Sequence, residues 1–254
     1  MTVDPYVTCP LAVSTYIESV RADAATLADL GRVEPLTMPI ATCGDWTLRE
    51  LLRHVGFVHR WATRAIADAA APDRSSVAMP PDETSDSLVS WFIDGAKGIC
   101  EALATLPTDA PTWHPFPAPL VGAVWVRRMA HETMVHRLDA ELAAGRTPSV
   151  DPVLASDGID EYLSLIVPHL VRQGRVDLPT SSLHLHCTDV AGEWLVTNVD
   201  GLDLVREHAK GDAALRGPAG AMLAELWGRR GALGECEIVG DVSAADAWLA
   251  IGGN

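Results

Sequence analysis

The hydrophobic period of the chain changes once, near residue 145, and this change limits the folds that it can adopt. Before that point, apolar residues recur every three to four positions, as in helices that bury one face. Afterwards, short segments with alternating apolar residues appear, which is typical of strands. We therefore expect an α plus α/β chain, in which an all-helical domain at 1–147 precedes a smaller α/β domain at 148–254.

In the first part, the period predicts helices at about 10–31, 47–70, 84–106 and 120–145. The second of these is the clearest. Thr47 and Glu50 have the spacing of a capping box, and apolar residues follow at the i, i+3 and i+4 positions of a bundle helix. Residues 106–120 contain five prolines, which forbid a helix and favour an extended crossover.

The second part begins with a linker-like stretch, GRTPSVDP, at residues 145–152. We predict a helix near 152–172 and then a hairpin, formed by SSLHLHCTD and GEWLVTNV with a turn around Ala191 and Gly192. Three further elements follow: a helix in GPAGAMLAELWGRRG, a strand in CEIVGD and a closing helix in AADAWLAIG.

The charge of the chain restricts the kinds of partner that it can bind. The chain has 34 acidic and 19 basic residues, and its net charge of −15 would repel nucleic acid and anionic membranes. A small-molecule or protein ligand fits better. The start has no basic, apolar leader, and no 18 apolar residues follow one another, so we expect a cytoplasmic protein. Its five scattered cysteines fit reduced thiols.

The segment RRMAHETMVHRLDAE, at 127–141, carries ionisable groups on a predicted bundle helix. Glu132 and His136 are four residues apart and lie within about 40° of each other, whereas His131 is turned about 140° from His136. Arg128 and Asp139 share the sector. Two interpretations are open: a metal site in which Asp139 orients an imidazole, or an exposed face of ordinary salt bridges.

A metal site needs a third ligand from another helix, and the helix at 47–70 offers His54 and His59. His59 is nearer the middle of the apolar stripe, so periodicity alone mildly favours it. The two histidines are five residues apart and cannot both point at one metal. The histidine that is not a ligand would be a buried one with a hydrogen-bonding partner.

Four stretches of the chain carry a resemblance to a known family. They are DWTLRELLRHVGFVHRW, HETMVHRLDAELAAG, LAELWGRRG and CEIVGD. With them, the sequence resembles the mycothiol-dependent maleylpyruvate isomerase family over almost its entire length. The resemblance implies a DinB-like metal-binding four-helix bundle followed by a smaller α+β domain similar to sterol-carrier folds.

The resemblance also implies a site and a reaction. The family's zinc ligands match His54, Glu132 and His136, and its thiol cosubstrate is mycothiol. Zinc, or another divalent metal, would favour the thiolate, which would attack an electrophilic small molecule. The outcome would be cis-trans isomerisation of a maleylpyruvate-like acid or transfer of the thiol. The alternative is a non-catalytic module with a vestigial metal site that binds a small molecule or a protein.

Arginines are the natural anchors for a substrate carboxylate. Arg229 matches the family's Leu-Trp-Gly-Arg signature, so we expect it to be the catalytic arginine, ahead of Arg60 and Arg64; alternatively, it binds the free carbonyls at a helix end. His184 and His186 alternate onto one side of a strand and could mimic a metal pair. The local sequence offers no third ligand, which favours a structural or solvent-facing pair.

Overall fold

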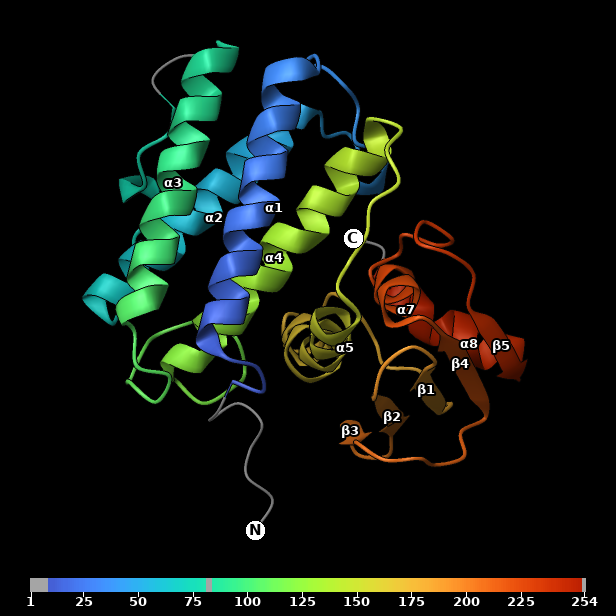
Figure 1. The fold of residues 1–254 in the computed structure, drawn as a ribbon. Coiled ribbons are helices and arrows are strands. Elements are labelled where there is room, and N and C mark those ends of the chain that lie inside the picture. Colours follow the sequence, from blue (N-terminus) through green and yellow to red (C-terminus); the bar gives the residue numbers. More distant parts are fainter. Residues whose placement is uncertain (1–8, 81–83, 253–254) are drawn as a thin grey trace. The chain divides into compact units, whose positions relative to one another are not determined.

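The structure is a computed structural model, which describes residues 9–80 and 84–252 (Figure 1). Contacts divide the chain between Arg146 and Thr147 into two compact units. The outermost residues of the two predicted domains, 1–8 and 253–254, lie outside the described residues. The expected order of a helical domain and then a mixed α and β domain is confirmed.

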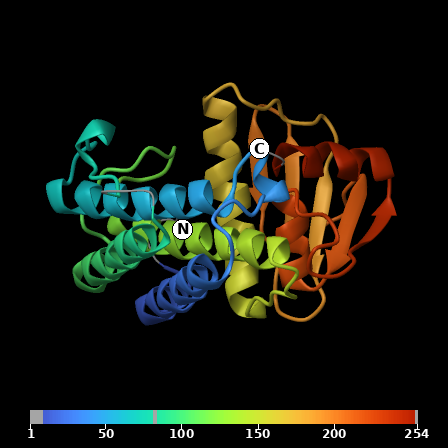
Figure 2. The same cartoon turned by 90° about the horizontal axis from the view of Figure 1, so that it is seen from above.

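The first unit is built on four long helices. They are α1 (Val13–Val33), α2 (Leu48–Asp68), α3 (Ser85–Thr105) and α4 (Gly122–Ala143). Helix α1 packs on α3 and α4, and α2 packs on the same two helices, so the four close into a bundle (Figure 2). All four predicted helices are confirmed, with ends that differ by no more than about three residues.

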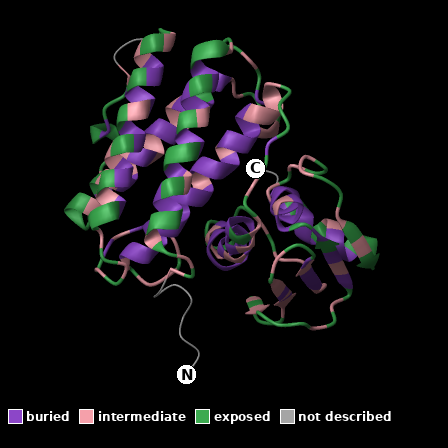
Figure 3. Ribbon diagram, in the orientation of Figure 1, coloured by how far each residue is buried: buried purple, intermediate pink, exposed green. Residues whose placement is uncertain are grey.

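Local sequence explains where α2 begins. Thr47 is its N-cap, and the Thr47 backbone N–H donates to Glu50 Oε2 at 2.9 Å, which completes the predicted capping box. The apolar stripe of α2 then faces the bundle core, where Leu48, Leu51 and Leu52 are fully buried. Figure 3 shows that the bundle helices bury one face and expose the other.

The connections within the first unit are short or non-helical. The 3-10 helices η1 (Ala41–Cys43) and η2 (Arg74–Ser76) lie before and after α2. The proline-rich segment between α3 and α4 is not helical, as predicted, but it is not simply extended: it turns back on itself, and the Thr112 N–H donates to the Leu120 carbonyl at 3.0 Å. Trp125 Nε1 donates to the Trp113 carbonyl at 2.8 Å. Among the described residues, no helix combines the length and the apolar character needed to cross a membrane.

The second unit contains a five-stranded mixed sheet in the order β3-β2-β1-β4-β5 (Figure 1). Its strands are β1 (Leu183–Cys187), β2 (Glu193–Asn198), β3 (Leu202–Val205), β4 (Ala213–Gly217) and β5 (Glu237–Gly240). Strands β1 and β4 are parallel, and the other neighbours are antiparallel.

The helices of this unit are α5 (Pro152–Glu161), α6 (Val167–Arg172), α7 (Ala219–Leu226) and α8 (Val242–Leu249). A π-helical turn at Tyr162–Ile166 joins α5 to α6, and a 3-10 turn, Ala250–Gly252, follows α8. The predicted hairpin, the later strand and the three helical segments are present.

Two strands, β3 and β4, were not predicted. Their sequences, LDLV and AALRG, are short, and β4 consists mostly of residues with low strand propensity. Strand β4 forms despite this low propensity because it lies between β1 and β5 and hydrogen-bonds to both. Along β1, Leu183 and Leu185 are fully buried in the core of the unit, so alternation places His184 and His186 on the opposite face of the sheet.

Candidate metal centre

Three side chains from two helices meet in the first unit. His54 of α2 and Glu132 and His136 of α4 each offer one ligand atom, and these atoms all lie within 4.8 Å of one another. Residues 54 and 132 are 78 positions apart in sequence. The packing of α2 on α4 therefore creates the cluster, and the four-residue spacing on α4 places Glu132 and His136 one turn apart.

Glu132 lies at the centre of the cluster. Its Oε1 is 2.9 Å from His54 Nε2 and 3.5 Å from His136 Nε2. Its other oxygen, Oε2, accepts a hydrogen bond from Arg128 Nη2 at 3.2 Å. The buried Arg128 guanidinium thus fixes one carboxylate oxygen, and the second faces the two imidazoles.

Asp139 orients His136 from the other side of the ring. Its Oδ2 is 3.2 Å from His136 Nδ1 and accepts from Cys43 Sγ at 3.3 Å, and its Oδ1 accepts from Thr42 Oγ1 at 2.6 Å. A buried carboxylate beside Nδ1 favours the tautomer that carries its proton there. The Nε2 lone pair of a neutral His136 is then available on the side of Glu132.

The indole of Trp46 packs beside both imidazoles. Its ring centroid is 4.8 Å from that of His54 and 6.1 Å from that of His136, and the two imidazole centroids are 5.0 Å apart. An aromatic neighbour restricts the rotation of these rings and shields one side of the cluster from water. Trp46 directly precedes the cap of α2, so the same turn places both the helix start and this contact.

The cluster perturbs the protonation of its own members. Burial alone would raise the pKa of Glu132, but hydrogen bonds from His136 and His54 and the charge of Arg128 hold that pKa well below its usual value. Burial alone would lower the pKa of His136, but Asp139, Cys43 and Glu132 raise it well above its usual value. Negative charge is therefore concentrated around His136, which favours a proton or a metal cation there.

The two histidines that compete as the third ligand have different surroundings. His54 lies against Glu132, whereas His59 is fully buried and its Nε2 is 2.9 Å from the Thr133 hydroxyl oxygen. Burial lowers the pKa of His59 to about 4. Periodicity thus identified His59 correctly as inward-facing, but it is His54 that meets Glu132. His131, predicted to turn away, packs edge-on against Tyr16 at 6.2 Å.

Thr42, Cys43 and Trp46 were not predicted to belong to this centre. Cys43 also forms a second possible ligand group with His136 and Asp139. None of the five cysteines forms a disulfide, and Cys43 differs from the others by its contact with the Asp139 carboxylate. A sequence signal existed, because these residues lie directly before the capped helix that carries His54.

The other arginines considered have structural partners. Arg60 Nη2 donates to the Trp91 carbonyl at 2.5 Å and its guanidinium lies 4.1 Å from the Trp91 ring centroid. Arg64 pairs with Asp68 at 2.5 Å. Arg229, in the turn after α7, donates to the Trp227 carbonyl, which is the helix-end interaction considered for it. Its expected role toward a substrate carboxylate stays a prediction.

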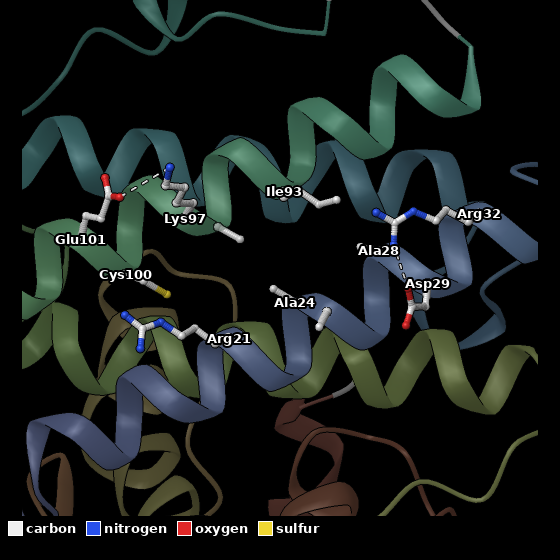
Figure 4. A pocket seen from close by; sticks show the side chains of 11 residues that line it. Arg21, Ala24, Ala28, Asp29, Arg32, Ile93, Lys97, Cys100 and Glu101 are labelled. Atoms are coloured by element: carbon white, nitrogen blue, oxygen red, sulfur yellow. Dashed lines mark hydrogen bonds and ion pairs between the residues drawn. The ribbon is translucent and has the colours of Figure 1, made fainter.

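A groove of about 470 Å³ lies between α1 and α3 (Figure 4). Small residues such as Ala24, Ala28 and Ala96 form its floor. At its edges, Arg32 pairs with Asp29 at 2.7 Å, and Lys97 lies 3.9 Å from Glu101. None of the residues that line it belongs to the histidine and glutamate cluster. Groove and cluster are therefore separate features of the bundle.

Comparisons with known families match both units. The family described as "Mycothiol maleylpyruvate isomerase N-terminal domain" matches residues 18–141. The family described as "MDMPI C-terminal domain" matches residues 153–247. Together these matches cover most of the chain, including every residue of the cluster. No curated protein matches the chain significantly.

Solved structures of similar fold come from the same family. One similar structure is a crystal structure of the mycothiol-dependent maleylpyruvate isomerase, with a TM-score of 0.61 and 12% sequence identity over 92% of this chain and 96% of that chain. A histidine-to-alanine mutant of that enzyme matches over the same shares, with a TM-score of 0.60 and 12% identity. At this identity, the likeness supports a shared fold.

Proposed function

The chain belongs to the mycothiol maleylpyruvate isomerase family, and from this premise we propose that it is a zinc-dependent enzyme that activates mycothiol for attack on an electrophilic small molecule. The observation that carries the proposal is the meeting of His54, Glu132 and His136 in the bundle. The chemistry expected is cis-trans isomerisation of a maleylpyruvate-like acid or transfer of the thiol.

The donor set fits a zinc ion. Two imidazoles and one carboxylate are ligands that zinc prefers, and catalytic zinc sites use three protein ligands and leave a position open. When bound, zinc supplies a Lewis acid that lowers the pKa of an incoming thiol. Magnesium and calcium fit less well because they prefer ligand sets made of oxygen atoms.

The surrounding residues prepare this donor set. Arg128 binds Glu132 Oε2 and leaves Oε1 directed at the imidazoles. Asp139 holds the Nδ1 side of His136, which leaves Nε2 for a cation. Trp46 packs on both rings and limits their movement. The arrangement thus restricts the ligands before any cation binds, and this reduces the entropy lost on binding.

The two reaction outcomes share their first half. Addition of the thiol sulfur to a carbon of a cis double bond converts that bond to a single bond, about which the molecule can rotate. Elimination of the same sulfur then returns the trans isomer and the free thiol. With an electrophile that carries a leaving group, the new carbon–sulfur bond remains and the product is a thioether. Arg229 is our candidate to bind the carboxylate of either substrate.

Metal analysis together with product analysis tests the proposal. We expect the purified protein to hold zinc at the bundle cluster, about one equivalent of which is lost in His136→Ala. His169→Ala, which changes a histidine of α6, is the matched control and should keep its zinc. Mycothiol and a cis-enoyl acid should yield the trans isomer with no net thiol consumption, whereas S-transfer would consume the thiol.

A different result would favour the non-catalytic module. If His136→Ala holds as much zinc as the unmodified protein, and neither isomer nor thioether forms with mycothiol, the proposed enzyme function is wrong. If a thioether forms stoichiometrically without isomerisation, the protein is still an enzyme, and its reaction is S-transfer.

A further inference from the structure

A second group of possible metal ligands lies in the second unit, and the function proposed above does not use it. It consists of His184, His186, Glu193 and His208, and their ligand atoms all lie within 4.8 Å of one another. We propose that this group is a separate binding site for a zinc-like divalent cation, with three imidazole ligands and one carboxylate ligand.

The sheet brings together three of the four residues. His184 and His186 are two positions apart on β1, so both side chains leave the same face. In the antiparallel register of β1 and β2, Glu193 lies directly across from His186 and therefore on that same face. His208 comes from the segment that connects β3 to β4. Three separate segments thus contribute to one point.

The distances converge on Glu193. Its Oε2 is 3.1 Å from His184 Nε2 and 2.6 Å from His208 Nδ1, and its Oε1 is 3.2 Å from His186 Nδ1. The three imidazole planes are 70° to 89° apart. The rings are therefore not stacked, and each has one nitrogen within 3.2 Å of a Glu193 carboxylate oxygen. Four ligand atoms at this spacing can reach one cation.

The alternative is that Glu193 simply accepts hydrogen bonds from three imidazoles. The geometry favours a cation, because three imidazoles and one carboxylate from three separate segments each bring a ligand atom to within 4.8 Å of the others. A nearby positive charge would repel a cation. Arg216 of β4 lies beside His186 in the sheet register, but its guanidinium is 3.6 Å from the Glu237 carboxylate of β5, which offsets its charge.

The ligand types and their exposure indicate the class and the role of the cation. Imidazole-rich sets suit zinc, nickel and copper, and four protein ligands are typical of structural zinc sites. The His208 side chain is 78% exposed, whereas that of His184 is 7% exposed. A bound cation would therefore link the exposed connection between β3 and β4 to strand β1, and would stabilise the sheet.

The experiment uses the full chain and zinc alone as the probe. Zinc content is measured in the unmodified protein, in His136→Ala, in His186→Ala/His208→Ala and in the triple variant. We expect about half of the zinc to be lost in each of the first two variants and nearly all of it in the triple variant. In His136→Ala, cobalt should give visible absorption bands that disappear when His186 and His208 are also replaced.

His208→Ala alone controls for misfolding, because this exposed side chain can be removed without opening the core. In the His136→Ala background, His208→Ala should weaken zinc binding. His169→Ala in the same background should not. The proposal is overturned if His136→Ala already holds no zinc, or if His186→Ala/His208→Ala holds as much zinc as the unmodified protein. Failure of the bundle site gives the opposite pattern, in which only the His186→Ala/His208→Ala pair removes zinc.

Discussion

Glu132 and Asp139 have different tasks, although both are carboxylates on α4. Glu132 faces two imidazoles and is offered as a ligand, whereas Asp139 is fully buried behind His136 and accepts from Thr42 and Cys43. In the proposed zinc site, Asp139 is therefore a positioning residue that acts through the His136 ring. The difference can be tested by a change that keeps its shape.

We expect Asp139→Asn to weaken zinc binding at the bundle cluster by about 10- to 100-fold, because loss of the carboxylate removes the partner that fixes the His136 tautomer. The dissociation constant is measured by competition with a coloured chelator, in chains that also carry the His186→Ala/His208→Ala pair. Asp29→Asn, which changes an exposed carboxylate of α1, is the control. An unchanged affinity, with the circular dichroism of both variants normal, would contradict the role given to Asp139.

His59 couples the stability of the bundle to pH. Its pKa in the folded chain is about 4, below the ordinary value of 6.5, because burial disfavours the charged ring. The unfolded chain therefore takes up the proton first as the pH falls. The stabilisation is fully present above pH 6.5 and is lost as the pH falls toward 4. Between pH 7.5 and 5, the contribution to the free energy of unfolding falls by about 2 kcal/mol.

His59→Gln tests this contribution, because glutamine can still donate to Thr133 but does not titrate in this range. The free energy of unfolding is measured with urea at pH 7.5, 6 and 5 for both proteins. Titration of the remaining groups is common to the two, so we expect the stability of the variant to fall less, by about 2 kcal/mol at pH 5. Parallel pH profiles would show that His59 is not the group responsible.

At the scale of elements, much of the fold could be predicted from the sequence, and the reason is local. Helix α2 carries its own cap and stripe, so periodicity identified it, whereas β4 depends on hydrogen bonds to β1 and β5. The same distinction between local and non-local signals applies to the two proposed sites. Glu132 and His136 are neighbours on one helix, but Glu193 meets His186 only through strand register, and no local pattern predicted that His208 would join them.

The contact between α2 and α3 depends on glycines at close approach. A Cβ added at Gly56 of α2 would overlap with the Trp91 ring of α3, whereas one added at Gly98 of α3 would meet no atom within 4 Å. We expect Gly56→Ala to lower the free energy of unfolding by about 1–3 kcal/mol, because the two helices must separate or Trp91 must move. The measurement is urea unfolding at neutral pH.

Gly98→Ala is the matched control, since it makes the same chemical change in a helix without the overlap. It should raise the stability by about 0.5–1 kcal/mol, because alanine loses less backbone entropy than glycine in a helix. Equal effects of the two substitutions would mean that α2 and α3 can adjust their spacing freely.

At the scale of the whole molecule, the negative net charge opposes the binding of the anionic substrate that we propose. The net charge of −15 repels an anionic substrate at long range, so a carboxylate must be recognised by individual cationic groups. In the first unit, Arg60, Arg64 and Arg128 already pair with a carbonyl or with carboxylates. Arg229 also donates to a carbonyl, that of Trp227, and it is the one to test first because it matches the family signature.

We expect Arg229→Ala to lower kcat/KM for a carboxylate-bearing electrophile by about 100-fold, because a charge-assisted hydrogen bond contributes roughly 2–3 kcal/mol. A neutral electrophile should lose far less, and zinc content should not change. Arg229→Lys should recover only part of the activity, since lysine keeps the charge but not the two-pronged geometry. Arg230→Ala, which removes an exposed partner of Asp246, is the control. If Arg229→Ala slows neutral and anionic electrophiles equally, the arginine supports the fold of its turn through the Trp227 carbonyl and does not bind the substrate carboxylate.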